Sequence, residues 1–582
     1  MPKKRSFVVL LAGVLGLSVY QFRRQLIGQA LRLPPVRHRV EVLRGIQIPM
    51  PDGVFLAADL YSPRARRLFP TILVRTPYGR GLSVGPSGML MSFAAQRFAE
   101  RGYNVLVQDM RGRFGSGGEF VPFVHEAADG RATLDWIEDQ DWFNGLLGMW
   151  GASYLGYAQW AAAGGASPAL KAIVPAVCGS NMPVSFLGRG AFDLDVTLRW
   201  MYELDAMNRS SWLRSLAGLG KMAPMLMEQR IKRAANHLPL VEVDRLVTGK
   251  PVSFYQDWQQ HPSLDDPYWR AADHSPLVTR VSAAAHFVSG WYDLFLNDLL
   301  ADYARLREAG QTPYLTIGPW FHMHPELAQE DLRHGITWFD ANLKGDRRSL
   351  RPSPVRLFVQ GVGEWRDLSA WPPPARSRSY YLQPGGGLSH QPLSMETAEP
   401  TRYTYDPRDP TPALGGPLLN GSAGAVDNRR LEARPDVLSF TGPVLNADLE
   451  VIGPLKAVLY VNSDREYTDF FVRLCVVASD GVSTNLCDGF IRLVPGSGER
   501  QEDGSLRIEI AISPTAYRFQ AGQRLRLLVA SGAHPRFARN PGTGLSLTGS
   551  SELLPARQAV YHDARHPSAL VLPVIETFGE EI

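Results

Sequence analysis

GMWGASYLG, residues 148–156, marks a sharp passage from a strand into a helix. Apolar residues lead into Gly151-Ala-Ser153, and the helix-forming run GYAQWAAA follows. A serine on such a turn is exposed at the carboxyl end of a sheet, with its hydroxyl beside a helix N-terminus. Gly151 leaves room before Ser153, but the general pattern has its second glycine where this chain has Leu155, and glycine follows only at 156. The alternative interpretation is an ordinary helix N-cap serine beside small packing residues.

The sequence around this turn alternates between strand and helix patterns. Thr71–Arg75 and Asn104–Gln108 are β-branched runs typical of buried parallel strands, and residues 89–100 (MLMSFAAQRFAE) have apolar residues at helical spacing. Residues 40–180 are therefore expected to form the first part of an α/β sheet built from right-handed crossovers.

Two later changes of pattern divide the rest of the chain. Met, Leu, Arg and Trp dominate residues 181–275 without strand runs, which predicts an inserted helical cap. The α/β pattern resumes over residues 276–352. Beyond them, short alternating runs such as VRLFVQ and RIEIAI are separated by Gly, Asp, Asn and Pro, which predicts a jelly-roll β-sandwich over residues 353–582.

Polar residues follow three more predicted strands. Asp293 stands in GWYDLF, and His322 ends GPWFH. Each could be structural by itself, as a helix N-cap or a loop histidine. The order Ser153, Asp293, His322 at successive strand ends is nevertheless the order of the α/β-hydrolase fold. Tyr78, in VRTPYGR, follows an early strand where such folds place the oxyanion loop, although a half-buried structural tyrosine is the alternative.

The chain resembles the cocaine esterase and X-Pro dipeptidyl-peptidase family of serine hydrolases. The resemblance is carried by MPDGVFLAADLYSP, VRTPYGR, VQDMRGRFGSGGEF, WGASYLGYAQW, GWYDLF, GPWFH, WFDANLKG and NLCDGFIR, scattered from about residue 49 to residue 492. Members of this family have the form G-x-S-Y-x-G, so Leu155 with glycine at 156 fits the family pattern. The family fold is an α/β-hydrolase core with an inserted helical cap and a C-terminal jelly roll, which coincides with the division expected from the patterns.

This resemblance implies a role for each candidate residue. Ser153 is the nucleophile, His322 the general base and Asp293 the acid that orients the base. The hydroxyl of Tyr78 and the backbone N–H of Tyr154 donate to the oxyanion. The implied reaction is acyl transfer through an acyl-enzyme, and no cofactor is implied.

The expected substrate is a small ester or amide. Amino-ester hydrolases of the family carry Glu where this chain has Leu155, which argues against that branch. An X-Pro dipeptidyl-peptidase is an alternative, but it needs a carboxylate or amide pocket for a free amino terminus, and the sequence does not place one. A catalytically silent binding protein that uses its jelly roll is the alternative of another class. Residues of the helical insertion that would suit an apolar acyl pocket, but are more often core, are Trp200, Met201, Tyr202 and Trp212.

Composition excludes several other classes. The 582 residues are 45% hydrophobic and carry a net charge of +4 without a long basic run, so neither disorder nor nucleic-acid binding is expected. His322 and His324 lack a third ligand at a convincing spacing, so no metal site is expected. Cys178, Cys475 and Cys487 are too few for a disulfide scaffold. A three-residue hairpin loop would place Cys475 opposite Cys487, but two buried thiols are favoured over a disulfide.

Residues 1–39 are expected to be a separate N-terminal segment. Lys3, Lys4 and Arg5 precede the uncharged run Ser6–Phe22. This pattern predicts an uncleaved membrane anchor or an export signal, with the catalytic body outside the cytoplasm. A cytoplasmic protein with a fraying helix is the alternative. Membrane contact is expected through this segment only, and the sequence does not indicate an oligomeric state.

Overall fold

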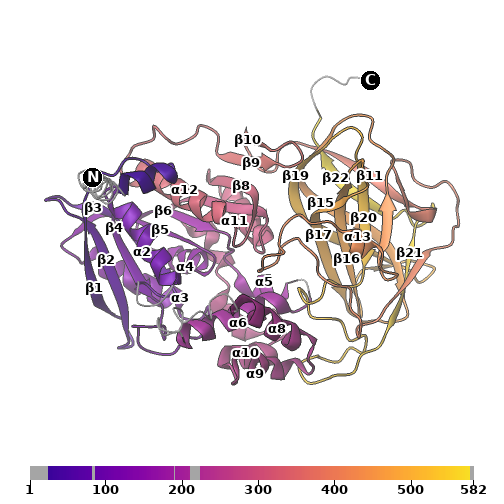
Figure 1. Cartoon of the computed structure of the whole chain (residues 1–582), viewed down its shortest axis with the longest axis horizontal. Coiled ribbons are helices and arrows are strands. Elements are labelled where there is room, and N and C mark those ends of the chain that lie inside the picture. Colours follow the sequence, from indigo (N-terminus) through magenta and orange to yellow (C-terminus); the bar gives the residue numbers. More distant parts are fainter. Residues whose placement is uncertain (1–23, 82–85, 189, 210–222, 577–582) are drawn as a thin grey trace, which may run out of the picture.

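A computed structural model describes residues 24–81, 86–188, 190–209 and 223–576 of the chain. It contains an α/β part, a group of helices beside it and a large β part on the far side (Figure 1). The predicted fold class, an α/β-hydrolase core with a helical cap and a C-terminal jelly roll, is confirmed.

The α/β part is built on a ten-stranded sheet of order β1-β2-β4-β3-β5-β6-β7-β8-β9-β10. Neighbouring strands from β4 through β3 to β9 run parallel, whereas β1, β2 and β10 pair antiparallel. The strands are β1 (Val40–Pro49), β2 (Phe55–Pro63), β3 (Phe69–Thr76), β4 (Asn104–Asp109), β5 (Phe143–Ala152), β6 (Leu170–Ala176), β7 (Ala284–Tyr292), β8 (Tyr314–Phe321), β9 (Val355–Val359) and β10 (Glu364–Leu368). Every residue of β3 and β4 is buried, because helices cover both faces of the sheet.

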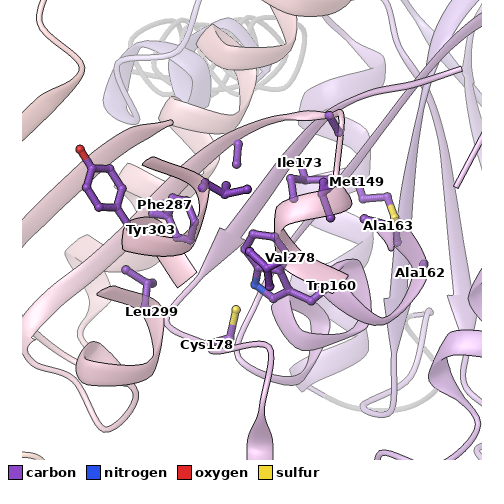
Figure 2. Packing of buried hydrophobic residues seen from close by; sticks show 14 of the residues in the cluster. Met149, Trp160, Ala162, Ala163, Ile173, Cys178, Val278, Phe287, Leu299 and Tyr303 are labelled. Atoms are coloured by element: carbon purple, nitrogen blue, oxygen red, sulfur yellow. The ribbon is translucent and has the colours of Figure 1, made fainter. Parts of the chain in front are cut away.

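Five helices cover the two faces of this sheet. Helices α2 (Pro86–Ala99) and α12 (Pro325–Leu343) share one buried apolar cluster with the strands. Helices α3 (Glu126–Glu138), α4 (Tyr154–Ala163) and α11 (Leu296–Glu308) share another on the opposite face. In this second cluster Trp160 packs on Phe287, with ring centroids 5.6 Å apart, and Cys178 lies nearby (Figure 2). This packing fixes α4, and therefore the turn that precedes it.

The cap lies between β6 and β7, and its described residues form helices, as predicted. These are α5 (Met182–Leu187), α6 (Leu194–Arg209), α8 (Ala223–Asn236), α9 (Val243–Thr248) and α10 (Ser253–Gln260), with 3₁₀ turns η3 (Leu240–Glu242), η4 (Pro267–Ala272) and η5 (Ser275–Arg280). Their apolar side chains form one buried cluster with Tyr154, Tyr157 and Ala158 of α4. The cap is thus packed directly on the helix that follows Ser153.

The β part is a twelve-stranded sheet folded on itself around a separate apolar core. Its strands are β11 (Arg376–Gln383), β12 (Gly387–Ser389), β13 (Thr401–Tyr405), β14 (Leu438–Thr441), β15 (Leu449–Ser463), β16 (Thr468–Val477), β17 (Ser483–Leu493), β18 (Glu499–Arg500), β19 (Leu506–Phe519), β20 (Arg524–Ala530), β21 (Ala556–Tyr561) and β22 (Ala569–Val574), with turn η6 (Pro384–Gly386) and helix α13 (Arg429–Glu432). Ile452 and Ala516 belong to the core of the α/β part, so the two parts pack together.

The cysteines of the β part are unbonded. Strand register places Cys487 opposite Leu474 and Cys475 opposite Asn485, because a bulge falls between Leu474 and Cys475. Both thiols are free and buried, which confirms the preference for thiols over a disulfide.

The predicted anchor or signal, Ser6–Phe22, lies outside the described residues. The described chain starts in a short helix over residues 24–30. No helix in the described part of the chain combines the length and apolarity needed to cross a membrane.

Candidate active site

The turn between β5 and α4 holds Ser153 in an unusual backbone conformation. Its φ is 59° and its ψ is −126°, a strained combination for a residue with a side chain and one that is common at functional sites. Gly151 has a φ of 145°, and a Cβ added there would stand 2.5 Å from the Cβ of Leu155. Glycine is therefore required at 151 for both backbone and packing reasons.

Gly156 explains the displaced second glycine of the motif. A Cβ at this position would lie 2.4 Å from the sulfur of Cys178 and 3.1 Å from the carbonyl oxygen of Ala176. Close approach of α4 to the end of β6 therefore requires glycine at 156, whereas Leu155 packs in the apolar cluster on the other face of the sheet.

The structure brings Ser153, His322 and Asp293 together from three strand ends. His322 Nε2 lies 3.0 Å from Ser153 Oγ, and His322 Nδ1 lies 2.7 Å from Asp293 Oδ2. The other oxygen of Asp293 accepts a hydrogen bond of 2.8 Å from the N–H of Phe295. His322 and Asp293 are both buried, so the imidazole is oriented in a site shielded from bulk water. This is the geometry that a serine nucleophile with a histidine base requires.

Tyr78 lies beside Ser153, two residues after β3. Its hydroxyl accepts a hydrogen bond of 3.2 Å from the indole N–H of Trp200 in α6. Burial raises the pKa of Tyr78, the charge of Glu203 raises it further, and hydrogen bonds with Trp200 and Ser153 oppose this rise. The phenol is thus protonated at neutral pH and lies within hydrogen-bonding reach of the serine.

Tyr154 is the first residue of α4, so its backbone N–H is among the amides that a helix N-terminus leaves without an intrahelical acceptor. Its side chain has a separate structural task. The hydroxyl donates to Glu126 Oε1 at 2.6 Å and accepts from the N–H of Phe123 at 2.8 Å. These two hydrogen bonds hold the buried side chain, and with it the first residue of α4, in place.

A cavity of about 40 Å³ opens beside Ser153. Its lining is largely apolar and comes from the core, the cap and the β part: Tyr78, Phe123, Ser153, Tyr154, Met182, Phe186, Val196, Trp200, Leu294, Phe295, His322 and Leu419. Of the predicted wall residues, Trp200 lines the cavity, whereas Met201 is buried in the cap core and Trp212 lies outside the described residues. Tyr202 packs at the margin of that core.

Glu203 is a charged residue near the site that the sequence did not single out. It lies on α6, one helical turn after Trp200, and is half-buried. Burial raises the pKa of Glu203, while the charges of His322 and Arg199 lower it. Arg199 is already bound by Asp195 at 2.8 Å and by Glu228. Glu203 therefore places a carboxylate within electrostatic range of the histidine.

His324, the second histidine of the sequence pair, has a local role. Its Nδ1 accepts a hydrogen bond of 3.3 Å from the N–H of Glu326, which caps the start of α12. It is therefore engaged in helix capping beside His322.

Comparisons with known proteins identify two matching families and a similar full-length protein. Residues 52–324 match the X-Pro dipeptidyl-peptidase (S15) family, and residues 350–571 match the X-Pro dipeptidyl-peptidase C-terminal non-catalytic domain. The chain is 33% identical to cocaine esterase of a Rhodococcus species, over 92% of this chain and 99% of that protein.

Solved structures share the fold. An aminopeptidase from a marine sediment archaeon of the Thaumarchaeota superimposes with a TM-score of 0.75 at 22% identity, over 93% of this chain and 98% of the other. An α-amino acid ester hydrolase superimposes with a TM-score of 0.73 at 23% identity, over 92% and 97%.

Proposed function

Because the chain belongs to the serine hydrolase family of cocaine esterase and the S15 X-Pro dipeptidyl-peptidases, we propose that it cleaves a small ester or amide through an acyl-enzyme on Ser153. The observation that carries this proposal is the continuous hydrogen-bond chain from Asp293 through His322 to the hydroxyl of Ser153. The strained turn at Ser153 supports the same role, because it holds the hydroxyl out at the carboxyl end of the sheet.

In the first step, Ser153 Oγ attacks the carbonyl carbon while its proton passes to His322 Nε2. Asp293 accepts the hydrogen bond from Nδ1 and stabilises the imidazolium. The hydroxyl of Tyr78 and the N–H of Tyr154 donate to the oxyanion. His322 returns the proton to the leaving oxygen or nitrogen. Water, deprotonated by the same imidazole, then attacks the acyl carbon; the bond to Ser153 Oγ breaks, His322 returns the proton to Oγ, and the acid is released.

The cavity supports a small apolar acyl group. Phe123, Phe186 and Trp200 line it, and its volume is only about 40 Å³. We therefore expect acetyl and propionyl esters to be cleaved with higher kcat/KM than benzoyl esters.

Dipeptidyl-peptidase activity is the second candidate, and Glu203 is the observation that favours it. The reaction needs an anionic group for the free amino terminus of the substrate, and Glu203 lies within electrostatic range of His322. If this candidate is right, Glu203→Gln lowers kcat/KM for an Ala-Pro arylamide by about tenfold or more and leaves a neutral aryl acetate nearly unchanged. Glu242→Gln, which removes a carboxylate elsewhere on the cap, is the matched control.

The main proposal is tested by turnover of a short-chain aryl ester with the wild-type protein and with Ser153→Ala. We expect the variant to lose at least about three orders of magnitude in kcat. Equal turnover by the two proteins contradicts the role of Ser153. A folded wild-type protein that cleaves neither the ester nor the arylamide favours the binding-protein alternative.

A further inference from the structure

A strongly basic surface lies at the edge of the sheet opposite the active site. It is formed by residues that precede β1, connect β2 to β3 and follow α12; the arginines on it are Arg37, Arg39, Arg64, Arg66, Arg67, Arg347 and Arg348. Ser153, Asp293 and His322 follow the carboxyl ends of β5, β7 and β8. Because β3 runs parallel to β5, the loop that enters β3 lies at the other edge. We call this surface the basic corner; it is at the left of Figure 1, on the side of β1 and β2.

Direct contacts join these residues into one surface. The N–H of Arg64 donates to the carbonyl of Arg39 at 2.8 Å. The guanidinium of Arg67 lies 4.7 Å from the ring centroid of Phe69, whose other neighbour is His38 at 5.1 Å. Burial and then the charges of Arg67, Lys344 and Arg37 lower the pKa of His38, so these cations surround one imidazole. The corner is therefore continuous from the first strand to the end of α12.

Most of these cations are not neutralised. All seven arginines are exposed, and none of the ion pairs formed within the described residues includes Arg37, Arg39, Arg64, Arg66, Arg67 or Arg347. Arg348 pairs with Asp346, and Lys344 pairs with Asp340. The other exposed acids at this edge include Glu41 of β1 and Asp139 and Asp141, which precede β5, so the seven arginines outnumber them. The clustered like charges repel one another, so they do not stabilise the folded state.

Exposed apolar side chains accompany the cations. Leu43 is 61% exposed and Leu68 is 55% exposed, and both line a cleft of about 430 Å³ together with Val42 and Arg67. Leu26, in the short helix over residues 24–30, is 47% exposed. Nucleic-acid backbones are bound by cations and polar groups. Binding to a lipid surface is favoured in addition by the burial of aliphatic side chains.

We propose that the basic corner docks on a membrane surface containing anionic phospholipids. Arginines next to a bilayer attract anionic headgroups, and Leu43 and Leu68 can enter the boundary between headgroups and acyl chains. The sequence leading into this corner agrees, because the uncharged run Ser6–Phe22 stands between Lys3-Lys4-Arg5 and Arg23-Arg24. Docking by this edge leaves Ser153 and the cap facing away from the bilayer, open to a substrate in solution.

The test measures sedimentation of the full chain with vesicles of phosphatidylcholine alone and with vesicles that also contain phosphatidylglycerol. We expect stronger binding to the second kind, with a difference that shrinks as salt is added. Arg64→Glu/Arg66→Glu/Arg67→Glu should lower that phosphatidylglycerol-dependent binding by at least about tenfold. Binding to phosphatidylcholine alone, to which the N-terminal run contributes in both proteins, should not change.

The control triple variant reverses three exposed arginines of the β part, Arg378→Glu/Arg402→Glu/Arg430→Glu. It should keep the phosphatidylglycerol-dependent binding, and both triple variants should keep wild-type aryl-ester turnover, which shows that they fold. Equal loss in the two triple variants overturns the proposal, as does a wild-type chain that does not distinguish the two vesicles. Loss of affinity for a duplex DNA fragment without any lipid preference assigns the corner to nucleic acid instead.

Discussion

At the scale of single residues, Tyr78 shows how one side chain connects the cap to the chemistry. It accepts from Trp200 of α6, and we propose that it donates its own proton to the oxyanion that forms when Ser153 attacks. Tyr78→Phe keeps the ring and removes the donor. We expect kcat for an aryl ester to fall about 10²- to 10³-fold with little change in KM. Tyr61→Phe, which removes a phenol bonded to Ser92 away from the site, is the control; unchanged kcat in Tyr78→Phe contradicts the assignment.

Sequence patterns predicted some of these residues and missed others for a physical reason. Ser153, Asp293 and His322 each follow a strand, and parallel strands bring their carboxyl ends to one edge, so their proximity was predictable. Glu203 reaches the site only through the docking of α6 on α4, which no local pattern contains. The bond from Trp200 to Tyr78 depends on the same docking.

At the scale of elements, α4 packs so closely on the end of β6 that position 156 has no room for a side chain. Gly156→Ala would place a methyl group 2.4 Å from the sulfur of Cys178. We expect a lower melting temperature, with a cost of about 1–3 kcal/mol in the free energy of unfolding. Cys178→Ala in the same chain should restore most of that loss, which a double-mutant cycle measures. Additive effects of the two substitutions would contradict the contact.

Helix α12 carries a buried carboxyl that makes stability depend on pH. Asp331 is 2% exposed, and burial raises its pKa to about 8, with a hydrogen bond from Trp150 opposing the rise. Between about pH 4 and pH 8, Asp331 is therefore protonated in the folded state and ionised in the unfolded state. This contribution to stability is complete below pH 4 and is lost as pH rises through about 8.

Asp331→Asn should remove this dependence. Relative to the wild type, the variant should gain stability as pH rises from 4 to 8, by on the order of several kcal/mol at the upper end. Thermal unfolding across that range measures the gain. Asp340→Asn, in the same helix but paired with Lys344, is the control, and a pH-independent difference between Asp331→Asn and the wild type contradicts the account.

At the scale of the whole molecule, the β part supplies a wall of the site. Leu419 lines the cavity, and its loop, residues 414–428, is held by buried polar groups. Arg473 donates to the carbonyl of Leu414, and Asp488 binds Arg473 at 3.0 Å and Arg536 at 2.6 Å. Burial alone would raise the pKa of Asp488, but the two guanidinium groups outweigh it and lower the pKa to about 2.

Removing Asp488 should therefore affect both stability and catalysis. Asp488→Ala leaves two buried guanidinium groups without their anion, which costs about 3–5 kcal/mol in the free energy of unfolding. Because the loop that carries Leu419 loosens, kcat/KM for short-chain aryl esters should also fall. Asp480→Ala, on the exposed hairpin between β16 and β17, should change neither. If Asp488→Ala is destabilised but fully active, the β part does not contribute to catalysis at this site.

The sequence predicted the three parts of the molecule because periodicity changes from mixed, to helical, to alternating along the chain. The boundaries at residues 180, 275 and 352 stay predictions. Strand order in the β part depends on pairings between segments far apart in sequence, such as β15 with β22, which local patterns do not encode. The position of Leu419 likewise depends on distant contacts, because its loop is bound by Arg473 of β16 and bridges to Thr484 of β17.

The most direct test of the central claim is to treat the protein with a fluorophosphonate probe and locate the adduct by peptide mass spectrometry. A serine activated by His322 and Asp293 should carry one phosphonyl group on Ser153, and His322→Ala should abolish the labelling. Labelling of another residue, or no labelling of a folded wild-type protein, would contradict the acyl-enzyme mechanism.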